Sequence, residues 1–403
     1  MKHLERHNIL TDAQHGFRKQ RSCESQLILT VRDLAQGIEE KSQLDVILLD
    51  FSKAFDKVPH ARLLLKAAHY GVTGHTLRWI EQFLTGRHQK VVLNNEHSNI
   101  TEVTSGVPQG TVLGPLLFLM FINDLPEGVT SSARLFADDC ILYRKIESPA
   151  DSTILQEDLN TLQRWEEKWL MEFHPEKCQL LRVTNKRNVI QEDYTIHGHI
   201  LKNTDTAKYL GVDLHNKLSW QKHIHSTARK ADATRAFLQR NMRGCPRDTR
   251  AQCYTTLVRP IVEYASTIWD PHTKKDIDCL EMIQRRSARF VYQDFRRTSS
   301  VTQMMTQLGW ESLAERRAKA KITMMYRAVH GLVFIPVWTY LTPVISATRG
   351  NTVKFFIPYC RTTTMQYSFF PDTARLWNSL PPDVAAAESL ESFKTRLHGC
   401  LLR

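Results

Sequence analysis

Two adjacent aspartates, Asp138 and Asp139, lie within an otherwise apolar and aromatic stretch that runs from Arg134 to Tyr143. Burying one carboxylate is costly unless it is paired or neutralised, and a second carboxylate beside it adds like-charge repulsion. Two interpretations are open: an ordinary turn, which aspartate often forms, or a bound divalent cation that neutralises both charges. The β-favouring runs on either side predict a hairpin with the two aspartates at its tip.

A third carboxylate could complete a cation site. The apolar run from Val46 to Leu49 predicts a buried strand, and Asp50 stands directly at its end. If this strand neighbours the hairpin, Asp50 faces the aspartate pair. Three carboxylates can hold two metal ions about 4 Å apart, which is an arrangement used by polymerases and nucleases.

A Gly/Pro-rich loop forms a third element. It spans Ser105 to Gly110 and precedes an apolar helix that is predicted to reach about Asp124. Gly106 and Gly110 allow the backbone to approach a ligand closely. The alternative is a plain turn before a core helix.

These segments follow one another in an order that resembles the palm motifs of reverse transcriptases, closest to non-LTR (LINE-type, jockey-like) retrotransposon polymerases. The resemblance rests on DFSKAFDKV, SGVPQGTVLGPLLF and LFADD, with further likeness in LTDAQHGFRKQRS, FHPEKCQLLRV and KYLGVDL. It implies an RNA-directed DNA polymerase that transfers nucleotides from dNTPs to a DNA primer on an RNA template. The chain begins almost at LTDAQHGFR, so we expect an N-terminally shortened copy.

The resemblance also implies roles for individual residues. The metal ligands would be the carboxylates of Asp50, Asp138 and Asp139 and the carbonyl of Phe51, holding two Mg²⁺ ions, with Mn²⁺ as the alternative. The other implied roles are triphosphate binding by Arg18, sugar selection by Phe55, nucleotide contact by Gln109 and Gly110, leaving-group chemistry by Lys177, and primer grip by Leu210 and Gly211. Phe55 has a plain core position as its alternative role, and Lys177 an exposed loop position.

Charge is unevenly distributed along the chain. Residues 1–200 hold 23 Lys+Arg and 26 Asp+Glu, whereas the remaining residues are strongly basic. A helix is predicted from Ser219, as its cap, to Arg243, before Gly244 and Pro246. It carries Arg229, Lys230, Arg235, Arg240 and Arg243. We expect this helix to lie along the phosphates of the primer–template duplex; the alternative is a solvated helix face.

The predicted fold class is therefore α+β, with a right-hand polymerase architecture. Residues 1–217 would form partial fingers and an antiparallel palm sheet with packed helices, residues 218–300 a basic helical thumb, and residues 301–403 a mostly helical region of unknown role. Eight scattered cysteines and the absence of a long apolar run predict an intracellular protein without a membrane span, nuclear and cytoplasmic as for retrotransposon proteins. A catalytically inactive remnant that only binds nucleic acid, and a two-metal nuclease, are the alternative functions.

Overall fold

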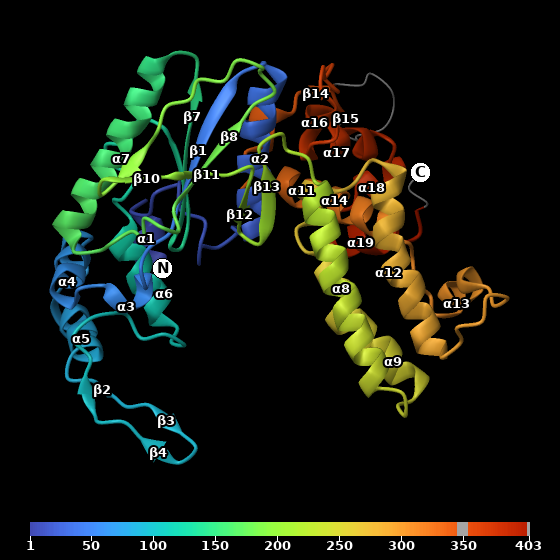
Figure 1. Ribbon diagram of the computed structural model, residues 1–403, viewed down its shortest axis with the longest axis horizontal. Coiled ribbons are helices and arrows are strands. Elements are labelled where there is room, and N and C mark those ends of the chain that lie inside the picture. The colour runs from blue at the N-terminus through green and yellow to red at the C-terminus, as the bar shows by residue number, and fades with distance from the viewer. Residues whose placement is uncertain (345–353, 401–403) are drawn as a thin grey trace. The chain divides into compact units, whose positions relative to one another are not determined.

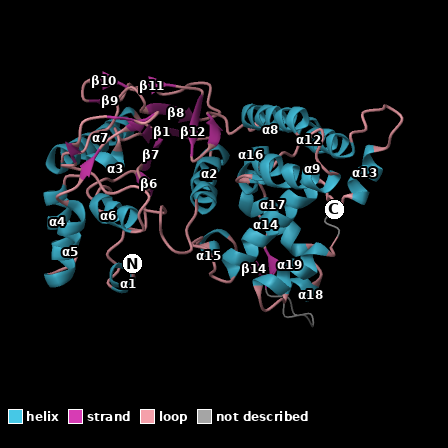
Figure 2. Cartoon of the chain, turned by 90° about the horizontal axis from the view of Figure 1, so that it is seen from below, coloured by secondary structure: helices cyan, strands magenta, loops and turns pink. Residues whose placement is uncertain are grey.

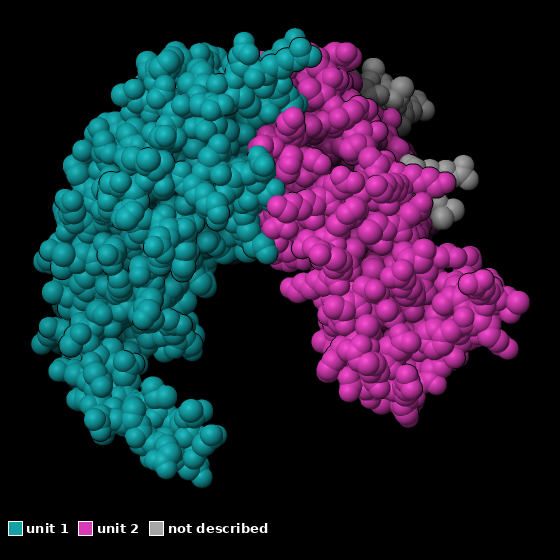
Figure 3. All heavy atoms as spheres, in the orientation of Figure 1, with its two compact units in different colours: residues 1–26, 41–210 teal, residues 27–40, 211–403 magenta. Residues whose placement is uncertain are grey.

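The computed structural model describes residues 1–344 and 354–400, which form two compact units (Figure 3). The first unit comprises residues 1–26 and 41–210, and the second comprises residues 27–40 with the described part of 211–403. The functional boundaries predicted at residues 217 and 300 stay predictions. Within the described residues, no helix combines the length and apolar character that crossing a membrane requires.

The first unit combines helices with one main sheet (Figure 1). Its elements are α1 (Lys2–Arg6), β1 (Gln43–Leu49), α3 (Ala54–Lys57), α4 (His60–His69), α5 (Gly74–Leu84), β2 (His88–Gln89), β3 (Val92–Leu93), β4 (Glu96–His97), β5 (Thr101–Glu102), α6 (Leu113–Ile122), β6 (Ser132–Phe136), β7 (Asp139–Ile146), α7 (Pro149–Trp169), β8 (Gln179–Val183), β9 (Thr195–Ile196), β10 (His199–Ile200), β11 (Lys202–Asn203) and β12 (Thr206–Tyr209).

The main sheet has five strands in the order β11-β8-β1-β7-β6. The central strand β1 pairs antiparallel with both β7 and β8, and β7 pairs antiparallel with β6. Only the short strand β11 pairs in parallel, with β8. The fold class predicted from the sequence, α+β with an antiparallel sheet, is confirmed.

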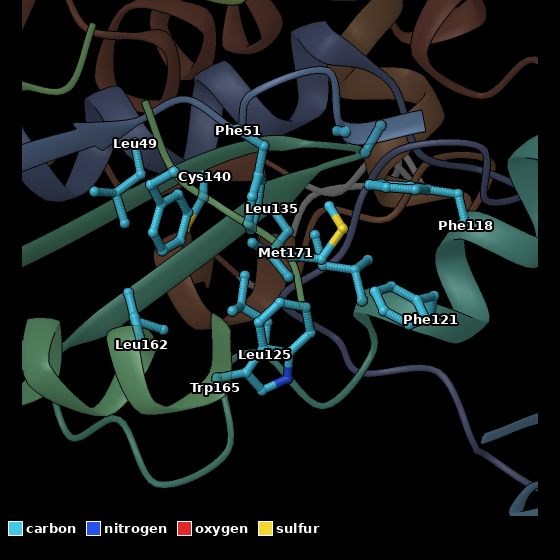
Figure 4. Close-up of a cluster of buried hydrophobic side chains, with 14 of the residues drawn as sticks. Leu49, Phe51, Phe118, Phe121, Leu125, Leu135, Cys140, Leu162, Trp165 and Met171 are labelled. Atoms are coloured by element: carbon cyan, nitrogen blue, oxygen red, sulfur yellow. The ribbon is translucent and has the colours of Figure 1, made fainter. Parts of the chain in front are cut away.

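Helices α6 and α7 contribute to the hydrophobic core that covers one face of this sheet. Figure 4 shows Phe118 and Phe121 of α6 and Trp165 of α7 in one cluster with Phe51 and Leu135. Helix α6 is apolar on all sides, which suits a helix enclosed by protein. A capping box between Ser148 and Asp151 fixes the start of α7. The core therefore holds β1, β6 and β7 in a rigid setting.

The second unit is mostly helical (Figure 1). Its elements are α2 (Cys23–Glu39, of which the first four residues belong to the first unit), β13 (Val212–His215), α8 (Gln221–Asn241), α9 (Arg247–Cys253), the π-helical turn η1 (Tyr254–Val258), α10 (Arg259–Glu263), α11 (Ser266–Trp269), α12 (Lys274–Tyr292), α13 (Val301–Gln307), α14 (Leu313–Val329), α15 (Val337–Tyr340), β14 (Pro343–Val344), β15 (Lys354–Phe355), α16 (Thr363–Gln366), α17 (Phe369–Asn378), α18 (Pro382–Ala385) and α19 (Leu390–His398).

Helix α14 organises the C-terminal part of the second unit. It packs against α11, α12, α17 and α19. Two cations on α14, Arg317 and Lys321, are almost fully buried and pair with Asp270, while Lys321 also pairs with Asp372. The mostly helical C-terminal region predicted from the sequence is thus present among the described residues.

Candidate active site

The three predicted metal-binding aspartates converge at one end of the main sheet. Asp50 follows β1, and the β6–β7 hairpin places Asp138 and Asp139 beside it. Leu49 pairs with Cys140 across the β1–β7 ladder, so the next step of the same register sets Asp50 opposite Asp139. The expectation that the buried strand neighbours the aspartate hairpin is confirmed.

The hairpin turn differs by one residue from the prediction. Its two turn residues are Ala137 and Asp138, whereas Asp139 is already the first residue of β7 and pairs with Phe136. Ala137 takes a left-handed conformation, with φ of 55°. The turn lies one residue earlier than predicted, because β7 extends its pairing to Asp139. Asp138 belongs to the turn, whereas Asp139 belongs to a strand whose successive side chains alternate between faces, so the two side chains leave the backbone in different directions.

A segment near the N-terminus holds this turn in place, although its sequence did not predict that it belongs to the site. Residues 13–15 run beside β6, and the buried side chain of Gln14 bonds both the N–H and the carbonyl of Ala137, at 2.8 and 3.1 Å. A Cβ atom on Gly16 would lie 2.3 Å from the Ala137 nitrogen. The signal in the sequence is a polar residue beside a glycine, which is too common to be assigned without the partner strand.

Burial and neighbouring negative charge raise the pKa values of Asp138 and Asp139. Burial raises the pKa of Asp139 to about 6, and the charges of Asp138 and Asp50 add to this shift. Burial also raises the pKa of Asp138, with a further contribution from Asp50. Asp139 keeps solvent-exposed surface, although the protein atoms around it desolvate its charged form. The site therefore carries negative charge that the neighbouring residues do not balance.

Lys177 supplies one positive charge. Its Nζ lies 3.2 Å from Oδ2 of Asp50, and its side chain is 60% exposed. That oxygen is itself buried and accepts no hydrogen bond of good geometry from any residue within the described ranges. Asp50, Asp139 and Lys177 line one cavity of about 380 Å³ together with Glu176 and Lys208. Two exposed lysines, Lys177 and Lys208, thus share this cavity with Asp50, Asp139 and Glu176.

The donor set suits a hard divalent cation. Carboxylate and carbonyl oxygens are the ligands that Mg²⁺ prefers, and an unsatisfied buried carboxylate oxygen on Asp50 is a ready ligand. No three His, Cys, Asp or Glu side chains of the described chain are gathered into a closed metal-binding cluster.

Phe51 holds the segment after β1 in place. Its ring stacks on Phe173, with centroids 4.2 Å apart, and the two residues form an antiparallel bridge. The flanking bonds are His174 N–H to the Asp50 carbonyl and Ser52 N–H to the Glu172 carbonyl. Since peptide directions alternate along a strand, the Phe51 carbonyl turns to the edge opposite Phe173. It is free of that bridge to serve as the predicted ligand.

The loop from Ser105 to Gln109 is tied to the segment that follows Asp50. Gly106 and Val107 donate N–H bonds to the carbonyls of Val58 and Phe55, both at 2.8 Å. A Cβ on Gly106, whose φ is +90°, would lie 2.7 Å from the Asp56 backbone. The close approach predicted at Gly106 is therefore to the protein's own backbone. Gly110, with φ of +76°, has open space around it.

Two predicted nucleotide contacts lie on this tied loop and segment. Gln109 Nε2 donates to the Asp56 carboxylate at 2.8 Å, so Asp56 is a hydrogen-bonding residue here. The half-buried ring of Phe55 stacks on Phe118 with centroids 4.3 Å apart, and Phe17 meets it edge-on. Phe55 therefore packs on the core while part of its surface stays accessible.

Arg18 and the predicted primer-grip turn complete the proposed site residues. The Arg18 guanidinium donates to the Thr11 carbonyl at 2.6 Å and lies 3.8 Å from Asp12, so it is engaged within its own segment. Leu210 and Gly211 both have positive φ, 45° and 81°, which is typical of a tight reversing turn.

Four of the five basic residues predicted on one helix are exposed, and the fifth forms an ion pair within the helix. Arg229, Lys230 and Arg240 on α8 are exposed, and Arg243 is exposed just beyond its end. Arg235 is instead held by Asp232 at 2.7 Å. The cap predicted at Ser219 is wrong, because Trp220 occupies the cap position and no side chain caps α8.

Comparisons with known proteins match a large part of the chain. Residues 1–214 match the family model described as "Reverse transcriptase (RNA-dependent DNA polymerase)". The chain is similar to the probable RNA-directed DNA polymerase from transposon BS of Drosophila melanogaster, with 29% identity over 70% of this chain and 33% of that protein. It is also similar to the RNA-directed DNA polymerase from mobile element jockey of Drosophila funebris, with 30% identity over 68% of this chain and 31% of that protein.

The chain spans about a third of the length of these curated relatives. Among solved structures, telomerase of Candida albicans in complex with a telomeric RNA fragment matches with a TM-score of 0.40 and 12% identity, covering 86% of this chain and 58% of that one. Apo telomerase of Candida tropicalis matches with a TM-score of 0.37 and 9% identity, covering 76% and 49%.

Proposed function

The chain belongs to the reverse transcriptase (RNA-dependent DNA polymerase) family, and from this premise we propose that it is an RNA-directed DNA polymerase of a non-LTR retrotransposon. The jockey and transposon BS relatives confirm the predicted resemblance to jockey-like elements. The observation that carries the proposal is Asp50 set opposite Asp139, with Asp138 adjacent, at the end of a rigid sheet. Nuclear and cytoplasmic localisation remains part of the proposal, to be tested by imaging a tagged chain.

We propose that the carboxylates of Asp50, Asp138 and Asp139 and the Phe51 carbonyl hold two divalent cations, Mg²⁺ or alternatively Mn²⁺. When bound, the cations lower the pKa of the primer 3′-hydroxyl and stabilise charge on the triphosphate. Lys177 borders the same cavity and holds a proton at Nζ that is available to the leaving pyrophosphate. Its ion pair with Asp50 keeps it there while the carboxylate has no other cation.

The dNTP would lie against the tied loop. Gln109 and Gly110 offer polar and backbone contacts, and the accessible surface of Phe55 would occupy the place of a ribose 2′-hydroxyl. Arg18 would have to exchange its bond to the Thr11 carbonyl for one to the triphosphate. Phe55→Ala should therefore admit ribonucleotides more readily in single-nucleotide extension assays. Unchanged discrimination in a folded variant would assign Phe55 to the core alone.

The primer–template duplex would be bound by the exposed cations of α8. Replacing Arg229, Lys230 and Arg240 by glutamine should flatten the plot of log affinity against log salt by roughly one unit or slightly less for each phosphate that the helix no longer neutralises. Titration of labelled duplex at several salt concentrations measures this slope.

A matched control removes three charges that are also exposed but lie on other segments of the second unit, at Arg297, Arg361 and Lys394. This control variant should keep most of the parent slope. If the two triple variants had equal salt slopes, the cations of α8 would contribute no more than any other exposed charges, and α8 would not be part of the duplex site.

Primer extension on an RNA template, with Mg²⁺ and dNTPs, tests the function itself. The chain of residues 1–403 should extend the primer, and Asp138→Asn should reduce the rate on the order of a hundredfold while leaving the thermal unfolding transition in place. A chain that binds primer–template but extends no primer under any divalent cation would instead be the binding remnant, and the proposed enzyme activity would be rejected.

A further inference from the structure

A second cavity, of about 450 Å³, lies entirely within the second unit. Its lining residues precede or begin α8 and α12, or lie in α16 or directly after it. These three helices are labelled in Figure 2. The residues that give it chemical character are Lys217, Trp220, His272, Lys275, Asp276 and Tyr367. Its volume falls in the range of small-molecule binding sites, roughly 300–1,000 Å³. None of the proposed catalytic residues contributes to it.

Aromatic rings form part of its wall. The rings of His272 and Tyr367 stack in parallel, with centroids 4.2 Å apart and an interplanar angle of 5°. The half-buried indole of Trp220 lines the same space. A stacked ring pair alone is an ordinary packing feature. Three rings around one open cavity instead form a surface for a flat heterocycle, because every nucleobase presents a π-face.

Positive charge surrounds the same space. Lys217 and Lys275 are exposed, and neither has an ion-pair partner among residues 1–344 and 354–400. Of the two acidic side chains in the wall, Asp270 is neutralised by Arg317 on α14. Asp276 accepts the Thr273 hydroxyl at 2.7 Å through one oxygen and keeps its charge, so two lysines face one uncompensated carboxylate. The N-terminal ends of α8 and α12 add partial positive charge. An anion is therefore favoured at the cavity.

We propose that this cavity binds one unpaired nucleotide of a single-stranded nucleic acid. The base stacks against Trp220 and the His272–Tyr367 pair, and the phosphates on either side of it lie near Lys217 and Lys275. A free nucleotide has the same chemistry, but the basic character of residues 201–403, with 31 Lys+Arg against 16 Asp+Glu, favours a polyanionic strand. The proposal does not depend on polymerase activity, since binding alone tests it.

The test measures binding of the full chain to a labelled single-stranded RNA of about ten nucleotides, a length within the usual range of such sites. Tyr367→Ala should weaken binding about tenfold, which is a typical loss for one stacked base. Tyr367→Phe keeps the ring and should bind as the parent does. Trp338→Ala removes an exposed aromatic ring elsewhere in the second unit and should also have no effect.

Two neighbouring lysines provide a matched charge pair. Lys274 and Lys275 are both exposed, but only Lys275 lines the cavity. Lys275→Gln should weaken binding and flatten its salt dependence more than Lys274→Gln does. Both lysines are exposed, so we expect their variants to fold, and the comparison decides the question even if Tyr367→Ala fails to fold. Equal effects of the two lysine variants would overturn the proposal.

Photocrosslinking identifies the source of the nucleotide. An RNA containing 4-thiouridine should crosslink to peptides that contain Trp220, His272 or Tyr367, and a mononucleotide in excess should compete poorly. Crosslinks confined to other peptides would overturn the proposal. Full competition by AMP or UMP at the concentration of the RNA would overturn the assignment to a strand and give the cavity to a free nucleotide.

Discussion

Two clusters of aspartates, one in each unit, show opposite treatments of negative charge. In the second unit, Asp270 and Asp372 face two buried cations, with Arg317 Nε 2.6 Å from Asp270 and Lys321 Nζ within 2.7 Å of both carboxylates. In the first unit, three aspartates and Glu176 lie at or beside a cavity whose lysines, Lys177 and Lys208, are both exposed. The cluster of the first unit is therefore unbalanced, and the cluster of the second unit is balanced.

The difference shows that the charges of the cluster in the second unit stabilise the fold, whereas the charges of the cluster in the first unit are kept in place by it. A balanced buried network costs desolvation but leaves no charge alone, so breaking it is strongly destabilising. The unbalanced cluster gains nothing for stability, because burial and the charge of Asp50 raise the pKa values of both Asp138 and Asp139. The packed sheet keeps this cluster in place despite its cost. Functional sites commonly break a rule of local stability in this way.

The largest expected effect lies in the balanced cluster. Asp270→Asn leaves Arg317, which is 1% exposed, without its carboxylate, and should lower the free energy of unfolding by about 3–5 kcal/mol. Urea denaturation measures this loss. Asp278→Asn, at an exposed position on α12, is the control and should change little. A stable Asp270→Asn protein would mean that the network is not needed by the fold.

The same substitution in the unbalanced cluster should have the opposite signature. Asp139→Asn should reduce primer extension about a hundredfold, which corresponds to about 2.7 kcal/mol, and should leave the free energy of unfolding equal or higher. Asp193→Asn, at an exposed position of the first unit outside the proposed site, serves as the control and should change little. Destabilisation by Asp139→Asn would place this residue with Asp270 as a structural acid.

The pH dependence of stability should also distinguish the clusters. Burial raises the pKa of Asp139 from 3.8 to about 6, so between these values the folded chain binds a proton that the unfolded chain has released. The free energy of unfolding should therefore fall as pH rises from about 4 to about 6. Other groups titrate in the same range, so the quantity to measure is the difference between the parent and Asp139→Asn. A difference that stays constant over this range would contradict the raised pKa.

The smallest effect is expected from Lys177 of the unbalanced cluster. Lys177→Met removes an exposed ion pair and should change the free energy of unfolding by less than about 1 kcal/mol. Lys321→Met in the balanced cluster provides the contrast, since it leaves two carboxylates short of a cation. Similar losses from both variants, measured by thermal or urea unfolding, would end the distinction between the clusters.

Local patterns in the sequence predicted much of this site. The apolar run before Asp50 and the interrupted run around Asp138 gave a strand and a hairpin, because burial and turn chemistry act over a few residues. The clamp of Gln14 on Ala137 was missed, since it joins residues 123 apart and no local pattern encodes that partner. The Ser219 cap failed for a local reason: Trp220 already has helical dihedrals and displaces it.

Backbone hydrogen bonds between the 105–109 loop and the 55–59 segment mark off the residues between them as one stretch of the first unit. These bonds and the Pro59–Ser105 bridge join the two ends of the intervening stretch, residues 60–104. The stretch is therefore an insertion in which the chain leaves and returns to the same place. It contains α4, α5 and the short strands β2 to β5. Closure entropy rises only slowly with length, so insertions or deletions at its exposed tip leave the spacing between the loop and Asp50 unchanged. The exposed tip with β2 to β5 can therefore diverge in length and sequence without disturbing the catalytic geometry, whereas α4 and α5 place Leu63, Ala67 and Leu84 in the core beside α6 and are constrained.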